Sequence, residues 1–312
     1  MFSKNDVKED MYGYADVGSY GLAHSLLAWA RCVLWCKENR LAIIAPSWLH
    51  LQHRIGPLLR RERDNRQYHR LFSFQGYISG CRRSWLLKTR KKWCAETEDT
   101  SQLLRSGVGG VVVFRNKEVM NEETHFKDVV GHGYQLQQAL YQMTRPRFRP
   151  PAQFKPHIAI HVRMGDFRNA ESTDELRRGV KNSRLPISWY KGILEGLWLR
   201  VGFIPAIVYS DGDDTSLGPL IGLPGVSRAP RQPSVTDLLS IARASILISS
   251  GSGFSMWGSF LGATPRICFP GQRFVRVLGD PLGIDLEPEV CTPVNLSDEF
   301  FKEILTRLRR QV

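Results

Sequence analysis

The segment "HIAIHVRMGDF" (residues 157–167) joins a short apolar run to a cluster of polar side chains. A short apolar run bounded by turn signals is consistent with a buried strand. His161, Arg163 and Asp166 stand at the carboxyl end of this run, and Gly165 permits a sharp turn there. Ligands of open α/β sheets bind outside the carboxyl ends of the strands. The segment therefore predicts a buried parallel strand with a binding site at its end.

Similar apolar runs recur along the chain and alternate with longer helical patterns, which favours α/β layers around mostly parallel sheets. The predicted strands are residues 41–45, 110–114, 157–162, 205–210, 246–250 and 266–269. Apolar residues at helical spacing predict helices over residues 22–36, 234–244, 255–263 and 296–310. The fold class expected from these patterns is α/β.

The length of 312 residues predicts two domains, since a single core seldom grows far beyond about 250 residues. The stretch "TRPRFRPPAQFKP" (144–156) is rich in proline and basic residues and lies between a helical pattern and a strand. Proline cannot continue either element, so the boundary is placed there. We expect one domain over residues 1–150 and a second over 151–312.

The net charge of +13 indicates an anionic partner: a nucleic acid, a phosphate-bearing ligand or an acidic membrane surface. The basic surplus is concentrated in residues 60–70 and 82–93, and a solvated basic face is the alternative interpretation. A nucleic-acid-binding protein is the competing class, but no RNP, KH or zinc-finger pattern accompanies the charge.

The six cysteines are scattered, and no CxxC pair supports a zinc or redox site. Cys32 and Cys36 lie one helical turn apart, and two buried thiols are a better interpretation than a disulfide. The N-terminal residues lack the order of a signal peptide, and no window approaches about 20 apolar residues. These features predict a cytoplasmic protein.

Two further predicted strands end in polar loops. In "YSDGDD" (209–214), Ser210, Asp211, Asp213 and Asp214 could accept hydrogen bonds from ribose or sugar hydroxyls, or form a solvated turn. Carboxylates also suggest a divalent cation, but the distal Glu of a calcium loop is absent, and no metal site is predicted.

The other loop lies in "ILISSGSGFSMWGSFLGA" (246–263), where a strand is followed by Gly251, Gly253 and a helix. Backbone N–H groups of such a loop form a phosphate cradle together with the helix N-terminus. Tight packing of strand against helix is the alternative, and neither a Walker loop nor GxGxxG is present.

Two carboxylates have a structural alternative as well. Ser234 and Asp237 match the capping box of a helix, which is the default interpretation of Asp237. Its carboxylate could instead accept both N1–H and N2–H of a guanine. Asp166 could form a purely structural ion pair with Arg163.

The three loops, in this order, resemble motifs of the fucosyltransferase superfamily that includes the α1,2-, α1,6- and protein O-fucosyltransferases. "HVRMGDF" is similar to "HVRRGDY" of the α1,2 group, and "ASILISSGSGFSMWGSFLGA" is similar to "NSTFSWWGA" after "A..IIS". "LPISWYKGIL" (185–194) resembles the segment after the first motif, and "GSYGLAHSLLAWARC" (18–32) resembles a "GGLGNQ" turn and helix.

The resemblance implies a GT-B fold, with two Rossmann-like domains facing each other across a cleft. The C-terminal domain would hold GDP-fucose as donor substrate, without metal or other cofactor. Arg163 would hold the pyrophosphate, and His161 and Asp237 would flank the guanine. The phosphate cradle would be completed by Ser252, Gly253, Phe254 and Ser255.

The implied reaction is an inverting transfer of L-fucose from GDP-β-L-fucose to a glycan hydroxyl, α1,2-linked, in surface polysaccharide or glycoconjugate synthesis. Asp16 and Asp166 are the candidate general bases. The chain departs from the family at Met164, where the second arginine is missing, and at His24, which replaces a polar amide. Another nucleotide sugar therefore remains an alternative donor. A lipid-linked acceptor would place residues 82–93 against the inner face of an anionic membrane.

Overall fold

The computed structural model describes residues 11–49, 64, 67–116, 126–151, 155–278, 284–288 and 295–310. The chain forms two compact units: Met1–Arg54 with Arg66–Arg145, and Ile55–Asn65 with Pro146–Val312. The change of unit at Arg145 lies inside the proline-rich stretch 144–156. Ile55–Asn65 belongs to the second unit, whereas a single boundary at residue 150 would place it in the first. Most of the basic stretch 60–70, and Cys291, lie outside the described residues.

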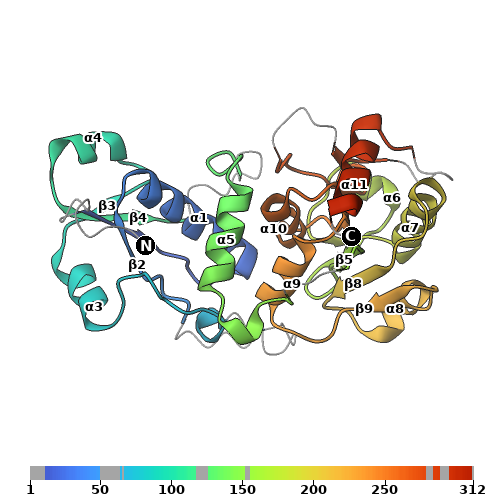
Figure 1. The fold of residues 1–312 in the computed structure, drawn as a ribbon, viewed down its shortest axis with the longest axis horizontal. Coiled ribbons are helices and arrows are strands. Elements are labelled where there is room, and N and C mark those ends of the chain that lie inside the picture. The colour runs from blue at the N-terminus through green and yellow to red at the C-terminus, as the bar shows by residue number, and fades with distance from the viewer. Residues whose placement is uncertain are drawn as a thin grey trace. The chain divides into compact units, whose positions relative to one another are not determined.

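The first unit is built on a parallel sheet with the strand order β2-β1-β4-β3. Its strands are β1 (Met11–Ala15), β2 (Ala42–Ile44), β3 (Lys92–Cys94) and β4 (Gly110–Phe114). Its helices are α1 (Leu22–Glu38), α3 (Gly80–Thr89), α4 (Thr100–Ser106) and α5 (Gly133–Met143), with a short 3-10 helix at Tyr68–Arg70 (Figure 1). Helix α1 packs along β1 and β4.

Cys32 and Cys36 are both free thiols, buried on α1. This confirms the interpretation that no disulfide joins them. Burial raises the pKa of Cys32. A neutral thiol behaves as a small apolar group, so these two residues belong to the packing of α1.

The second unit contains a six-stranded parallel sheet, ordered β12-β11-β10-β5-β8-β9. The strands are β5 (Ile158–Val162), β8 (Ala206–Ser210), β9 (Val226–Arg228), β10 (Ile246–Ser249), β11 (Arg266–Cys268) and β12 (Asp285–Leu286). Numbered by their place in the chain, they give the order 3-2-1-4-5-6 of a doubly wound, Rossmann-type sheet. The direction of winding reverses between β5 and β10. A separate two-stranded ladder joins β6 (Arg168–Asn169) and β7 (Ser183–Arg184).

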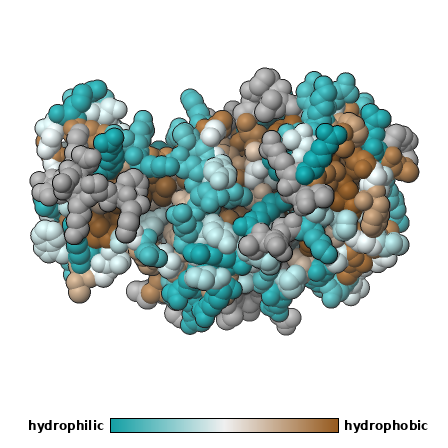
Figure 2. All heavy atoms as spheres, in the orientation of Figure 1, coloured by the Kyte–Doolittle hydropathy of each residue, from teal (hydrophilic) through white to brown (hydrophobic). Residues whose placement is uncertain are grey.

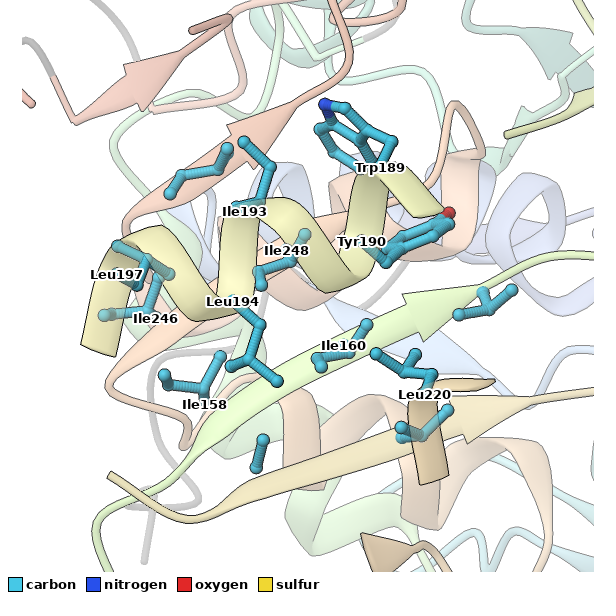
Figure 3. Close-up of a cluster of buried hydrophobic side chains, with 14 of the residues drawn as sticks. Ile158, Ile160, Trp189, Tyr190, Ile193, Leu194, Leu197, Leu220, Ile246 and Ile248 are labelled. Atoms are coloured by element: carbon cyan, nitrogen blue, oxygen red, sulfur yellow. The ribbon is translucent and has the colours of Figure 1, made fainter. Parts of the chain in front are cut away.

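Both faces of this sheet are covered, so its central strands β5 and β10 are buried along their whole length and mostly apolar. Ile158, Ile160 and Val162 point to one face and join a large core cluster, whereas Ala159 belongs to a cluster on the other. The helices are α6 (Thr173–Arg177), α7 (Ile187–Val201), α8 (Asp214–Ile221), α9 (Ser234–Ile241), α10 (Gly253–Gly262) and α11 (Asp298–Arg310). Figure 3 shows α7 side chains, including Ile193 and Leu194, packed toward β5 and β10.

The expected fold class, α/β with parallel sheets in two Rossmann-like units, is confirmed by the topology of each unit. All six predicted strands are present, and so are the predicted helices at α1, α9, α10 and α11. Among the described residues, no helix combines the length and the apolar character needed to span a bilayer.

Candidate functional site

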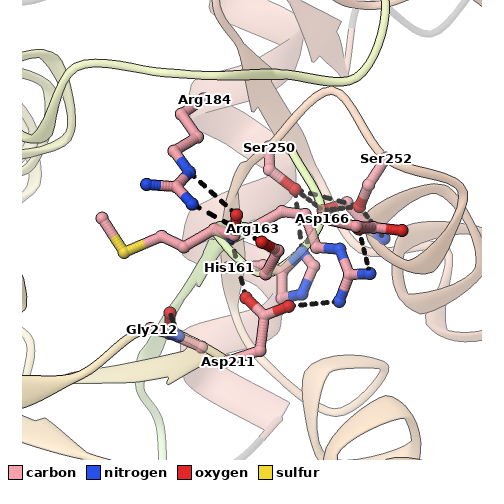
Figure 4. A network of polar contacts seen from close by, with 12 residues as sticks. His161, Arg163, Asp166, Arg184, Asp211, Gly212, Ser250 and Ser252 are labelled. Atoms are coloured by element: carbon pink, nitrogen blue, oxygen red, sulfur yellow. Dashed lines mark hydrogen bonds and ion pairs between the residues drawn. The ribbon is translucent and has the colours of Figure 1, made fainter. Parts of the chain in front are cut away.

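The candidate site lies where β5 and β10 end, at the point where the winding of the sheet reverses. Residues 163–167 follow β5, and residues 250–252 follow β10 and lead into α10. The two strands are direct neighbours, with Ile248 paired to Ile160. The topology therefore brings the first and third predicted loops to the same sheet edge (Figure 4).

Arg163 lies between two carboxylates. Its Nη1 donates to Asp211 Oδ2, and its Nη2 donates to Asp166 Oδ1 at 2.6 Å. The ion pair with Asp166, the structural alternative for these residues, is thus present, together with a second pair that the sequence did not predict. The Arg163 side chain remains 27% exposed, so the guanidinium is also accessible to solvent. A guanidinium carries five N–H donors, and these two contacts occupy two of them.

Asp211 fixes this arrangement and is 18% exposed. Its Oδ1 accepts a hydrogen bond from the backbone N–H of Met164 at 2.8 Å. Burial raises the pKa of Asp211, but the charge of Arg163 and the N–H groups of Met164 and Gly165 outweigh this and lower it. The carboxylate stays ionised, and its primary contacts are within the protein. This differs from the predicted role of Asp211 as an acceptor for a sugar hydroxyl.

The turns after β5 and β8 approach each other closely. A Cβ at Gly165 would overlap the Asp211 carboxylate, and one at Gly212 would overlap the Met164 sulfur. A side chain at either position would therefore displace Asp211 or Met164 from its present place. Met164, at the position of the missing family arginine, occupies this contact and packs against the core cluster.

Arg184 is a site residue that the sequence analysis missed. It lies on β7, and its Nε donates to the Met164 carbonyl at 2.8 Å, which braces the loop after β5 (Figure 4). Its only sequence signal is a position immediately before the segment 185–194 that resembles the family. Two arginines and two carboxylates meet around this loop, so their formal charges sum to zero.

His161 organises a cluster of hydroxyl groups on the other side of the site. Its Nδ1 hydrogen-bonds with Ser255 Oγ at 2.6 Å and Ser250 Oγ at 2.9 Å. Ser250 Oγ lies 3.0 Å from Ser252 Oγ, and Ser252 caps α10 by accepting from the Ser255 N–H. The centroid of the Phe254 ring lies 5.0 Å from the centroid of the His161 imidazole.

The loop after β10 also contains a close approach. A Cβ at Gly251 would lie 2.5 Å from Gln272 Oε1. The backbone at Gly251 therefore has little free space on the side of Gln272. Gly253 is the first residue of α10, so its N–H belongs to the first turn of the helix, where backbone N–H groups lack intrahelical partners.

The carboxylates of "YSDGDD" have separate local roles. Asp213 caps α8 by accepting from the Ser216 N–H at 2.7 Å, and Asp214 pairs with Arg228. Ser210 Oγ accepts from the Gly212 N–H at 3.0 Å. The described residues contain no group of three or more metal-ligating side chains.

The capping box predicted for Ser234 and Asp237 is wrong. Helix α9 begins at Ser234, its N-cap is Pro233, and no side chain at the N-cap accepts a bond. The Ser234 N–H and hydroxyl instead both donate to Asp64 Oδ2, at 2.9 and 2.6 Å. A carboxylate distant in sequence has taken the capping role. Asp237 is 3% exposed and accepts from Gln232 Nε2 at 2.7 Å.

Asp64→Ala is expected to lower the free energy of unfolding by about 1 kcal/mol, the typical cost of losing a capping acceptor. The φ of Asp64 is +58°, which alanine adopts less readily than asparagine. Asp64→Asn keeps an acceptor oxygen and should retain most of the stability. Urea denaturation of both variants measures the difference, and equal stability of Asp64→Ala and the wild type would refute this role.

Asp16 follows β1 and belongs to the first unit. It is 48% exposed and faces Arg115 at 3.5 Å. His24 is exposed near the start of α1, and its carbonyl accepts from the Asn116 side chain. The structure thus joins His161, Arg163, Asp166, Asp211 and the 250–255 loop, and it leaves Asp16 in a different unit.

No protein-family model matches the chain, and no curated protein does. The α-1,6-fucosyltransferase NodZ from Bradyrhizobium, soaked with GDP-fucose, is 13% identical at a TM-score of 0.45, covering 84% of this chain and 95% of that one. POFUT1 in complex with GDP-fucose is 12% identical to this chain at a TM-score of 0.41, and the match covers 84% of this chain and 98% of that one. A family 9 glycosyl transferase from Veillonella parvula DSM 2008 is 11% identical at a TM-score of 0.45, and the match covers 96% of this chain and 98% of that one. Function is therefore argued from the residues of this chain.

Proposed function

We propose that the chain is a metal-independent glycosyltransferase that moves L-fucose from GDP-β-L-fucose to a hydroxyl group of a glycan. The observation that carries the proposal is the meeting of two motif loops at the switch point of a Rossmann-type sheet. Such a crevice is where doubly wound sheets bind nucleotides. The resemblance of both loops to fucosyltransferase motifs supports fucose as the sugar.

The phosphates are assigned to Arg163 and to the N-terminus of α10. Ser252, Gly253, Phe254 and Ser255 form the first turn of that helix, where N–H groups and the helix dipole favour an anion. His161 holds the Ser255 hydroxyl, so the imidazole positions this turn. Arg163 supplies a planar fork that matches two phosphate oxygens.

Asp166 is expected to release Arg163 when the nucleotide binds. Asp166 and Asp211 both pair with Arg163, so a diphosphate must compete with them for this guanidinium. Asp166 is the more exposed partner, at 33% against 18% for Asp211, and within the described residues no backbone N–H holds it as the Met164 N–H holds Asp211. Exchange of Asp166 for a phosphate therefore costs less than exchange of Asp211.

Catalysis in this proposal rests on charge stabilisation at the leaving group. As the bond to fucose breaks, negative charge grows on the β-phosphate, and a guanidinium fixed by Asp211 stabilises that charge more in the transition state than in the ground state. Once released from Arg163, Asp166 is one candidate to accept the proton of the attacking hydroxyl, and Asp16 is the other.

Asp237 is assigned to the guanine. With Asp64 capping α9, the Asp237 carboxylate is not needed for the helix terminus. It accepts a hydrogen bond from the Gln232 amide, a neutral group that N1–H and N2–H of guanine could replace. Ser210 remains a candidate for the donor ribose or sugar.

The linkage and acceptor extend the proposal. The resemblance to the α1,2 group supports an α1,2-linked product, and a glycan or lipid-linked oligosaccharide of a surface polysaccharide is the proposed acceptor. Transfer would take place on the cytoplasmic side of the membrane, where nucleotide sugars are supplied.

Binding of GDP is the experiment that tests the donor class. GDP at 100 times its dissociation constant should stabilise the protein by about 2.7 kcal/mol and raise the melting temperature, whereas UDP, ADP and CMP should not. Inosine diphosphate lacks the N2 amine and should give a smaller shift than GDP. Asp237→Asn should remove the difference between these two purines. Equal shifts with all nucleotides, or none, would contradict the proposal.

A further inference from the structure

Helix α3 and the residues after it form a strongly basic surface in the first unit. Between Gly80 and Lys92 the chain carries six basic residues and no acidic one. The basic residues are Arg82, Arg83, Lys88, Arg90, Lys91 and Lys92. We call the exposed part of this segment, Arg82, Trp85, Lys88, Lys91 and Lys92, the α3 basic face.

Residues three apart on a helix share a face, so Arg82, Trp85 and Lys88 point to the same side of α3. The opposite side is anchored in the unit, because Leu86 is buried and Arg83 donates to the Ala45 carbonyl at 2.7 Å. The basic face is therefore the outward side of a fixed helix. In Figure 2 the area over α3 mixes hydrophilic, neutral and hydrophobic residues without one continuous apolar patch.

Trp85 is 54% exposed in the middle of this face, which is unusual for so large an apolar side chain. The Arg90 guanidinium lies over its ring at 5.6 Å from the centroid, and Lys91 Nζ lies 3.8 Å from the centroid of the Trp93 ring. The surface thus presents an exposed indole with a guanidinium directly beside it.

The cations of this face form no ion pair with any acidic residue that the structure describes. In the part of the chain that the structure describes, no ion pair involves Arg82, Lys88, Lys91 or Lys92. Lys92 on β3 could also serve to protect the edge of the sheet, since β3 is an edge strand. That role explains Lys92, but it does not require an exposed indole or the cations on α3.

We propose that the α3 basic face docks on an anionic lipid bilayer. Lys and Arg side chains bind the negative surface of a membrane, and indole rings favour the interface between headgroups and acyl chains. A nucleic acid fits the same surface less well. Single strands stack successive bases on several aromatic rings, whereas this face exposes one, with one side of its ring under Arg90. The inference concerns the first unit and does not depend on the donor sugar.

Co-flotation with vesicles tests the proposal on the full chain. The wild type is expected to float with vesicles of 70% phosphatidylcholine and 30% phosphatidylglycerol, and to stay in solution with phosphatidylcholine alone. Lys88→Glu with Lys91→Glu should reduce the partition coefficient about tenfold or more, since each basic residue near the surface contributes to binding. Trp85→Ser should reduce it several-fold at both low and high salt.

The matched control is Lys302→Glu with Arg309→Glu on α11, which changes the net charge by the same amount at exposed positions. This variant should float as the wild type does. Equal partition of wild type into both kinds of vesicle, or equal loss in the two double variants, would overturn the proposal. Tight binding of a single-stranded oligonucleotide would also overturn it, if the Lys88→Glu, Lys91→Glu variant lost this binding and the control variant kept it. Flotation needs no GDP, so its failure leaves the proposed transferase activity untouched.

Discussion

Arg163→Lys is expected to lower the rate of fucosyl transfer by about 100-fold or more, the loss typical of removing one donor that stabilises transition-state charge. A lysine keeps the positive charge but not the planar fork, so it cannot hold Asp211 and two phosphate oxygens together. GDP binding should weaken less than turnover does, because the lost interaction grows as the bond to fucose breaks. Turnover with saturating GDP-fucose, and the dissociation constant of GDP by calorimetry, measure the two effects.

The control for this prediction is Arg178→Lys, at an exposed arginine that ends α6 outside the candidate site. It should bind GDP and turn over as the wild type does. Full turnover of purified Arg163→Lys would remove Arg163 from the leaving-group role, and with it the central assignment of the proposed mechanism.

The fold of the second unit could be predicted because its strands are buried on both faces. Strands such as β5 and β10 then read as continuous apolar runs, which stand out against polar loops. In the first unit, β1 was missed although it has five residues and none of them is charged. The missed strands β3, β9 and β12 contain three residues or fewer and carry charged residues such as Lys92 and Asp285. Their place in the sheet is set by pairing with a longer neighbour, which leaves no periodicity in the local sequence.

The candidate site was predicted in its location but not in its internal contacts. Polar residues at strand ends identified the loops after β5, β8 and β10 without knowledge of strand order. The partner of each side chain depends on which strands are neighbours. Asp211 was interpreted as a ligand-binding residue because nothing in the sequence places it beside Arg163, 48 positions away.

The capping box of α9 failed for the same reason. Ser234 and Asp237 have the right spacing for a local cap, yet the helix starts at Ser234, one residue earlier than the box requires. Asp64 accepts the Ser234 N–H and hydroxyl from 170 positions away, and a carboxylate there fits the positive end of the helix dipole. A local pattern cannot detect an acceptor supplied by tertiary structure.

Asp211→Asn is expected to lower the free energy of unfolding of the second unit by about 3 kcal/mol, the order of magnitude for breaking one side of a largely buried ion pair. The amide is nearly isosteric and can still accept the Met164 N–H, so the turn keeps its shape while Arg163 loses its buried partner. The guanidinium should then become less well positioned, and turnover should fall together with stability.

The pH dependence separates this ion pair from a packing effect. The pKa of Asp211 is below its ordinary value of 3.8 in the folded protein, since the charge of Arg163 and two N–H groups outweigh burial. Its stabilisation is therefore complete above that ordinary value and is lost as the pH falls through the lower folded value. The stability difference between wild type and Asp211→Asn should be constant from about pH 5 to 7 and shrink below about pH 4. Urea denaturation at pH 7, 5 and 3.5 measures it.

Asp213→Asn is the matched control, because Asp213 is an exposed carboxylate two positions away whose pKa is also lowered, chiefly by its hydrogen bonds with Ser216. Asparagine caps helices about as well as aspartate, so this change should cost little at any pH. A loss of stability in Asp211→Asn that stays the same down to pH 3.5 would mean that packing, and not the charge of Asp211, holds the turn. In that case Arg163 would depend on Asp166 for its position, and the proposed exchange of Asp166 for a phosphate would fail with it.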